Sequence, residues 1–251
     1  MRRSLPFAPY ALVSAVHVVL LAIGHDLAGP TKLLLMPLLA IAVLWASADL
    51  RPRPRAALLL LLFAVLASWL GDGAGAFFPG LPELPMMLLC FGLAHLAYMW
   101  LFWRGRGTGA RIARRRRPPV WAWAFALWWI ALVSILGPST GGLLVPVMVY
   151  GAVLGGTATL ASRCGPVIAW GGAWFLVSDS ILAFRLFTPD AMPAWTSGAV
   201  MLTYCLGQGL IAYGVVAALR DAASAPHPPA IGSPALPAPP DSAILHDRNI
   251  G

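Results

Sequence analysis

The sequence predicts an all-α polytopic membrane protein, a bundle of eight transmembrane helices with both termini in the cytoplasm. Two observations support this prediction, the composition and the distribution of basic residues. Of the 251 residues, 59% are hydrophobic and only 10% are charged, and the mean hydropathy is +0.79. A soluble domain carries about 25% charged residues. Most of this chain is therefore expected to lie in a lipid bilayer.

Eight apolar segments approach or reach the length of about 20 residues that a membrane span requires. They cover residues 9–24, 32–48, 56–71, 85–103, 119–136, 142–161, 165–187 and 195–219. Each is expected to be a helix, because backbone groups in lipid must be hydrogen-bonded within their own segment. Residues 1–220 are thus predicted to form the membrane domain. Residues 221–251, which are rich in Pro and Ala, are predicted to form a disordered cytoplasmic tail.

The basic residues predict the orientation of the chain. With eight spans, the N-terminus and the loops after spans two, four, six and eight fall on one side. The basic residues there are Arg2, Arg3, Arg51, Arg53, Arg55, Arg104, Arg106, Arg111, Arg114, Arg115, Arg116, Arg117, Arg163 and Arg220. Loops rich in Arg and Lys stay in the cytoplasm. The net charge of +8 therefore indicates topology at an anionic leaflet and not a nucleic-acid partner.

These features predict a multi-pass protein of the cell membrane whose partners are membrane lipids. The oligomeric state is left open. No cofactor or metal is expected, because the three cysteines show no metal-ligand spacing and only His17 and His95 lie inside spans.

Asp179, in the seventh span, is the polar residue that is hardest to explain as purely structural. A carboxylate deep in a span costs about 2.5–3.5 kcal/mol on insertion scales, so it usually faces the bundle interior and has a partner. Arg185 is on a different helix face, so the partner is expected on another span. Asp72 closes the third span and Lys32, the only lysine, opens the second. The alternation of spans places all three toward the non-cytoplasmic side, where we expect them to line one cavity.

Other polar side chains raise the same question of a partner. His95 and Tyr98 share one face of the fourth span, Tyr150 lies in the sixth, and Tyr204 and Gln208 lie in the eighth. His95 and Tyr98 are expected to line the same cavity. Any of these side chains could also join two helices through a hydrogen bond and do nothing more.

Six short motifs occur in the order found in a known family. They are Thr31-Lys32 with Met36-Pro37-Leu38-Leu39, Trp69-Leu70-Gly71-Asp72, Phe91–Tyr98, Tyr150-Gly151, Gly172–Asp179 and Thr203–Gln208. Through these motifs the chain resembles, over about residues 10–217, the YhhN family of membrane proteins, whose characterised members are lysoplasmalogenases. The resemblance implies hydrolysis of the sn-1 vinyl-ether bond of a lysophospholipid substrate, a lysoplasmalogen. The products would be a fatty aldehyde and glycerophosphoethanolamine or glycerophosphocholine.

Vinyl ethers are stable to base and are hydrolysed by acid, which suits a pair of buried carboxyl groups. One group must hold a proton, and the other must stabilise the cationic intermediate and orient water. We assign Asp179, the deeper residue, as the general acid and Asp72 as its ionised partner. Lys32 could bind the substrate phosphate or neutralise Asp72. The expected substrate-binding set is Lys32, His95, Tyr98, Tyr150, Ser178, Tyr204 and Gln208.

Two other interpretations use the same residues. Buried Asp, Lys and His side chains also build the proton relays of small proton-coupled transporters. In a structural or accessory membrane protein they would only lock helices together.

The predicted orientation can be tested by cysteine accessibility. A cysteine at position 72, in a variant that lacks Cys90, Cys164 and Cys205, should react with an impermeant maleimide added from the non-cytoplasmic side. A cysteine at position 116 should react only from the cytoplasmic side. Labelling of position 72 from the cytoplasm would overturn the orientation.

Overall fold

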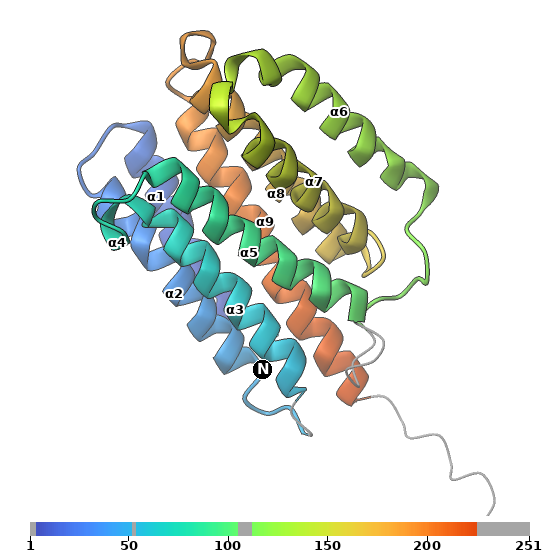
Figure 1. The fold of residues 1–251 in the computed structure, drawn as a ribbon. Coiled ribbons are helices and arrows are strands. Elements are labelled where there is room, and N and C mark those ends of the chain that lie inside the picture. Colours follow the sequence, from blue (N-terminus) through green and yellow to red (C-terminus); the bar gives the residue numbers. More distant parts are fainter. Residues whose placement is uncertain (1–3, 52–53, 105–111, 225–251) are drawn as a thin grey trace, which may run out of the picture.

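The computed structural model describes residues 4–51, 54–104 and 112–224 (Figure 1). Within these residues, eight helical segments are long and apolar enough to cross a membrane, and no strand occurs. Figure 1 shows these segments packed side by side in one bundle. The prediction of an all-α, eight-span protein is therefore confirmed, and the sidedness of the termini stays a prediction.

The helix bounds agree closely with the apolar segments of the sequence. The membrane helices are α1 (Ala8–Ala22), α2 (Ala28–Ala46), α3 (Arg55–Asp72), α5 (Glu83–Arg104), α6 (Ala124–Leu136), α7 (Leu144–Ala161), α8 (Pro166–Phe187) and α9 (Thr196–Ala223). Short 3₁₀ turns lengthen three of them, at Leu5–Phe7, Val120–Trp123, Gly137–Ser139 and Gly141–Leu143. The short helix α4 (Ala74–Phe77), which the sequence did not predict, turns the chain back after α3.

Helix α9 runs to Ala223, four residues past its predicted end at residue 219. Arg220 explains the extension, because its Nε donates to the carbonyl of Ala46 at 2.7 Å. Ala46 is the last residue of α2, and the last carbonyls of a helix have no donor within the helix and favour a cation. The rest of the predicted tail, from residue 225, lies outside the described residues.

Helices α8 and α9 approach each other closely through glycines. A Cβ added to Gly207 would lie 2.9 Å from the backbone nitrogen of Phe175 and 3.1 Å from the carbonyl oxygen of Gly171. A Cβ added to Gly171 would lie 2.8 Å from the backbone nitrogen of Ile211. Small residues let helix backbones come this close, which is a main source of packing energy between helices in lipid.

Helix α6 lies at the edge of the bundle and packs against α7 and α8 (Figure 1). Trp128 and Trp129 lie over Gly155 and Gly151 of α7. The indole of Trp129 donates to the carbonyl of Met148 at 3.0 Å, and the indole of Trp128 donates to Ser180 of α8 at 2.9 Å. Two tryptophans thus attach α6 to its neighbours.

Helix α2 contains Pro37, which has no N–H to donate to the carbonyl four residues earlier. That carbonyl belongs to Leu33, and it accepts a hydrogen bond of 2.9 Å from the indole of Trp69 in α3. The bond satisfies a backbone oxygen in a region without water. It also fixes α2 against α3 close to Lys32 and Asp72.

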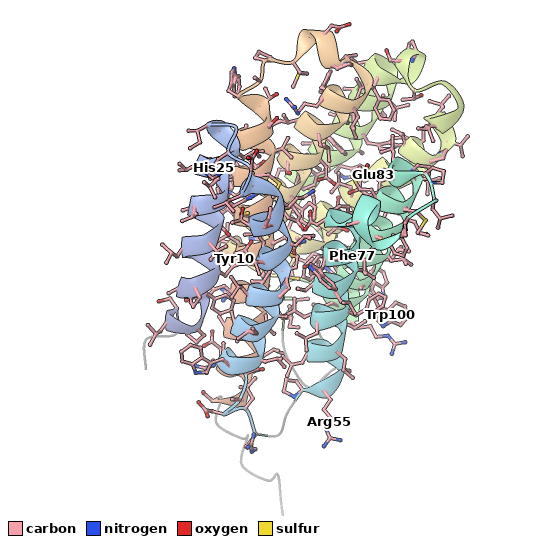
Figure 2. The ribbon with its side chains drawn as sticks, turned by 90° about the vertical axis from the view of Figure 1, so that its left-hand side faces the viewer. Tyr10, His25, Arg55, Phe77, Glu83 and Trp100 are labelled. Carbon is pink, nitrogen blue, oxygen red and sulfur yellow. The ribbon has the colours of Figure 1, made fainter. Side chains whose placement is uncertain are left out.

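The two ends of the bundle differ in charge. Figure 2 shows Arg55 at one end and His25 and Glu83 toward the other. The chain returns to the end with Arg55 after α2, α5, α7 and α9, so the described cations there are Arg51, Arg55, Arg104, Arg114, Arg115, Arg116, Arg117, Arg163 and Arg220. We call this the arginine-rich end. We call its opposite, where Asp26, Glu83 and Asp190 lie, the acidic end.

The glycine contact between α8 and α9 predicts a stability difference between two matched variants. Gly207→Ala places a methyl group against the α8 backbone, and overpacking of this kind costs about 1–3 kcal/mol. Gly92→Ala in α5 meets nothing within 4 Å. The midpoint of thermal unfolding in detergent should therefore fall for Gly207→Ala and stay equal or rise slightly for Gly92→Ala. Equal midpoints would contradict the observed packing.

Candidate functional site

A cavity of about 330 Å³ lies inside the half of the bundle nearer the acidic end, and all eight membrane helices contribute to its wall. Gly29, Leu84 and Phe187 line it at helix ends. Its wall is mainly apolar, with Met87, Leu132 and Leu182 among the lining residues. The polar residues of the wall are His17, Lys32, Asp72, Tyr150, Ser178, Asp179, Arg185, Ser197 and Tyr204.

Asp72 has a partner for each carboxylate oxygen. Lys32 Nζ lies 3.6 Å from Oδ1, and the hydroxyl of Tyr204 donates to Oδ2 at 2.7 Å. The Asp72 side chain is 4% exposed and that of Lys32 is 36% exposed. The ion pair therefore joins a buried carboxylate to a more exposed cation. Together with the bond from Tyr204, it links α2, α3 and α9.

Asp179 has a different environment. The hydroxyl of Tyr150, from α7, donates a short hydrogen bond to its Oδ2, which provides the partner on another span that the sequence required. His95 Nε2 lies 3.9 Å from the same oxygen, beyond hydrogen-bond distance. No Lys or Arg of the described residues comes within 4.0 Å of this carboxyl group.

Aromatic rings connect the two tyrosine–carboxyl pairs. The ring of Tyr204 packs edge-on against Phe175, with centroids 5.4 Å apart. Phe175 packs against His95 at 4.5 Å, and His95 packs against Tyr150 at 5.8 Å. Tilted and edge-to-face contacts of this kind are favourable and directional. One continuous row of packed rings thus connects the tyrosines that donate to the two carboxyl groups.

Three residues of the expected substrate-binding set do not line the cavity. Tyr98 donates to Gln208 Oε1 at 2.6 Å, and Gln208 Nε2 donates to Ser68 at 2.9 Å. This buried chain of hydrogen bonds links α5, α9 and α3 and leaves no group of Gln208 directed at a ligand. Tyr98 and Gln208 were expected either to bind substrate or to join two helices, and their hydrogen bonds match the second interpretation.

His95 is the third residue outside the wall. It is completely buried, and neither ring nitrogen has a hydrogen-bond partner. A buried imidazole without a partner is costly, and this one adjoins Asp179 across 3.9 Å. His95 therefore lies next to the Asp179 carboxyl group without lining the cavity, and its ring packs against Phe175 and Tyr150.

Ser178 lines the cavity, but its hydroxyl donates to the carbonyl of Val200 in α9 at 3.0 Å. The hydroxyl proton of Ser178 is thus already used in a hydrogen bond between α8 and α9, which leaves only the lone pairs of the oxygen for a ligand. Among the described residues, no group of three or more His, Cys, Asp or Glu side chains is placed to hold a metal ion.

The sequence interpretation missed three polar residues of the wall, His17, Arg185 and Ser197. His17 Nδ1 lies 3.0 Å from Thr31 Oγ1, whose own proton goes to the carbonyl of Leu27. Nδ1 is therefore the donor in a neutral ring, and the buried Nε2 is left without a partner. Tyr10, Ser14 and His17, at helical spacing on one face of α1, were the signal for a buried polar face.

Arg185 donates to Thr196 Oγ1 at 2.6 Å, at the start of α9, and it lines the cavity wall. Lys32, in the second turn of α2, and Arg185, in the last turn of α8, are thus two cations of the cavity wall.

Comparison with known proteins supports the resemblance seen in the motifs. A model of the YhhN family matches residues 28–215, which include every polar residue of the cavity wall except His17. No curated protein and no solved structure matches the chain significantly. The matched range covers most of the chain and seven of the eight membrane helices, and the chain belongs to the YhhN family.

Proposed function

We propose that this protein is a lysoplasmalogenase-like hydrolase of the cell membrane that cleaves the sn-1 vinyl-ether bond of a lysoplasmalogen. One observation carries the proposal: Asp72 from α3 and Asp179 from α8 line one cavity whose wall is otherwise mainly apolar. Acid hydrolysis needs a carboxyl group that donates a proton and a negative charge that stabilises a cation. Membership of the YhhN family is compatible with this activity.

The cavity suits a lysophospholipid, which has one hydrocarbon chain and a charged head group. The apolar wall would take the alkenyl chain. Lys32, in the second turn of α2, and Arg185, in the last turn of α8, would face the phosphate near the outer end. The unpartnered Nε2 of His17 is a further polar group for the glycerol or head group. The vinyl-ether bond would then lie between phosphate and chain, at the depth of the two carboxyl groups.

The contacts of the two carboxyl groups favour different roles. Asp72 accepts a hydrogen bond on one oxygen and has Lys32 at the other, an arrangement that stabilises a negative charge. Asp179 accepts one hydrogen bond from Tyr150 and has no cation in contact. We therefore assign Asp179 as the general acid and Asp72 as the ionised partner.

The reaction begins when the Asp179 carboxyl group transfers its proton to the β-carbon of the vinyl ether. A C–H bond forms, the C=C bond becomes single, and the α-carbon becomes an oxocarbenium ion that the Asp72 carboxylate stabilises. A water molecule, oriented by the same carboxylate, adds to the α-carbon and returns a proton to Asp179. The hemiacetal then collapses: its hydroxyl proton moves to the glycerol oxygen, the C–O bond breaks, and aldehyde and alcohol are released.

The proposal predicts that both carboxyl groups are required. Asp72→Asn and Asp179→Asn should each lower aldehyde release from a lysoplasmalogen by about 10²-fold or more, because an amide can neither donate this proton nor carry the charge. Asp190→Asn, which changes an exposed acid in the α8–α9 loop, is the matched control and should keep full activity. The acyl analogue of the substrate should release no aldehyde.

Full activity of either site variant would refute the two-carboxyl mechanism. Proton flux across liposomes without aldehyde release would instead favour a proton-coupled transporter, and the absence of both would favour a structural protein.

A second prediction separates the tyrosine that contacts the site from one that only links helices. Tyr150→Phe removes the hydrogen bond to Asp179 and should lower the turnover number about tenfold, with a smaller loss of stability than Tyr98→Phe because Asp179 lines the cavity. Tyr98→Phe leaves Gln208 without a donor and should cost about 1–3 kcal/mol of stability with turnover nearly unchanged. Kinetic constants and unfolding midpoints of both variants in one detergent check this, and the reverse pattern would contradict the assignment.

A further inference from the structure

His17, in α1, lines the cavity and has a buried ring nitrogen, Nε2, without a hydrogen-bond partner among the described residues. The residue is only 1% exposed. A buried polar atom without a partner is unfavourable, and in a cavity wall a ligand can supply the partner. The family match begins at residue 28 and does not include His17. The unpartnered nitrogen therefore needs an explanation of its own.

The contact with Thr31 determines what Nε2 can bind. Thr31 Oγ1 has one proton, which it directs at the backbone of α2, 2.7 Å from the carbonyl of Leu27 and 3.1 Å from that of Ala28. His17 Nδ1 lies 3.0 Å from the same hydroxyl oxygen and must be the donor in that contact. In a neutral imidazole, Nε2 is then a hydrogen-bond acceptor.

The surroundings of His17 favour the neutral ring. No carboxylate of residues 4–51, 54–104 and 112–224 lies within 4.0 Å of it. Lys32, which follows Thr31, lines the same cavity and disfavours a second positive charge there. A buried charge without a counter-ion is costly. The group that Nε2 binds is therefore a hydrogen-bond donor, and phosphate oxygens, which are acceptors, do not fit.

The depth of His17 in the bundle follows from the packing of α1 on α9. A Cβ added to Gly198, near the start of α9, would lie 4.0 Å from the Cβ of Ala22, the last residue of α1. Consecutive spans alternate in direction, so α1 and α9, the first and eighth, are antiparallel. His17 comes five residues before Ala22 and lies about 7.5 Å deeper. This is close to the depth of Tyr204, which donates to Asp72.

A lysoplasmalogen has a donor group that reaches this depth, the hydroxyl at sn-2. It is on the carbon next to the one that carries the vinyl ether, so it lies beside the carboxyl groups when the vinyl ether does. The ammonium of an ethanolamine head group lies beyond the phosphate, toward the acidic end with Asp26, Glu83 and Asp190. An ammonium at Nε2 would also add a cation beside Lys32, whereas the hydroxyl is neutral.

We propose that Nε2 of His17 accepts a hydrogen bond from the free sn-2 hydroxyl and so makes the cavity selective for lipids that have this hydroxyl. The inference rests on the proposed hydrolase function and adds a residue that determines its specificity. A site built to bind a hydroxyl rejects the analogue without it, because the buried acceptor then stays unpaired. An intact plasmalogen, which has an ester at sn-2, has no proton to donate there.

Two substrates that differ only at sn-2 test this role. The unmodified protein should release aldehyde from a lysoplasmalogen with a kcat/KM at least about tenfold above that for the 2-deoxy analogue. His17→Asn removes Nε2 and keeps an N–H near the place of Nδ1 for Thr31, so the preference should fall below about threefold. His17→Gln, whose amide oxygen can replace Nε2, should retain more of it.

His25→Asn is the matched control, because it changes an exposed histidine in the loop between α1 and α2 and should leave the preference unchanged. An unchanged preference in His17→Asn would overturn the proposal. Equal losses on both substrates would then assign Nε2 to the attacking water. A loss of discrimination between ethanolamine and choline head groups alone would assign it to the ammonium, because choline has no N–H.

Alkyl-ether lysophospholipids, which lack the vinyl ether and cannot be hydrolysed in this way, separate the inference from the proposed function. The unmodified protein in neutral detergent should bind the form with the sn-2 hydroxyl about tenfold more tightly than its 2-deoxy form, as measured by calorimetry. Equal affinities would overturn the proposal even if the His17 variants do not fold. This preference without aldehyde release from any lysoplasmalogen would refute the hydrolase and still support the role of His17.

Discussion

The backbone contact between α8 and α9 determines the geometry of the rest of the site. Gly171 and Gly207 have no side chain between them, so the two helices meet at backbone distance. Asp179 follows Gly171 by two turns of α8, and Tyr204 precedes Gly207 by less than one turn of α9. The hydroxyl of Tyr204 in turn holds Asp72 of α3. The close approach of α8 and α9 therefore positions both carboxyl groups. Asp179 lies on α8 itself, and Asp72 of α3 is positioned through its hydrogen bond with Tyr204 of α9.

Most buried polar side chains of the described residues have a hydrogen-bond partner, and the exceptions are Ser14, His17 and His95. Pro37 frees the Leu33 carbonyl and Trp69 bonds it, while Tyr98, Gln208 and Ser68 bond one another. The imidazole nitrogens without partners belong to His17 and His95. One of these residues lines the cavity and the other lies behind Asp179. In a medium without water an unmet hydrogen bond is expensive, so the location of these two histidines at the cavity wall and beside Asp179 supports the proposal that this cavity is functional.

The sequence predicted the spans well and the rotation of the helices poorly, for a physical reason. Length and hydropathy define a span, and alternation of direction then placed Lys32, Asp72 and Asp179 at one end. Hydropathy does not show which face of a span points into the bundle, because lipid is as apolar as the interior of the bundle. In α5, the exposed Leu93 and Leu96 stand beside the buried Ala94 and Ala97. Polarity alone therefore could not show that Tyr98 and Gln208 bond each other outside the cavity, or that His17 reaches it.

The hydrogen bond between Tyr204 and Asp72 spans 132 residues of sequence, and this has a consequence for biogenesis. As the chain leaves the ribosome, Asp72 and Lys32 enter the bilayer early, and α9 inserts after the other seven described membrane helices. Until then the Asp72 carboxyl group lacks one of its two partners, and the cavity lacks the wall that Val200, Met201 and Tyr204 provide. A nascent chain with the first seven of these helices in place is thus long enough to be anchored in the bilayer, but its site is incomplete until α9 inserts.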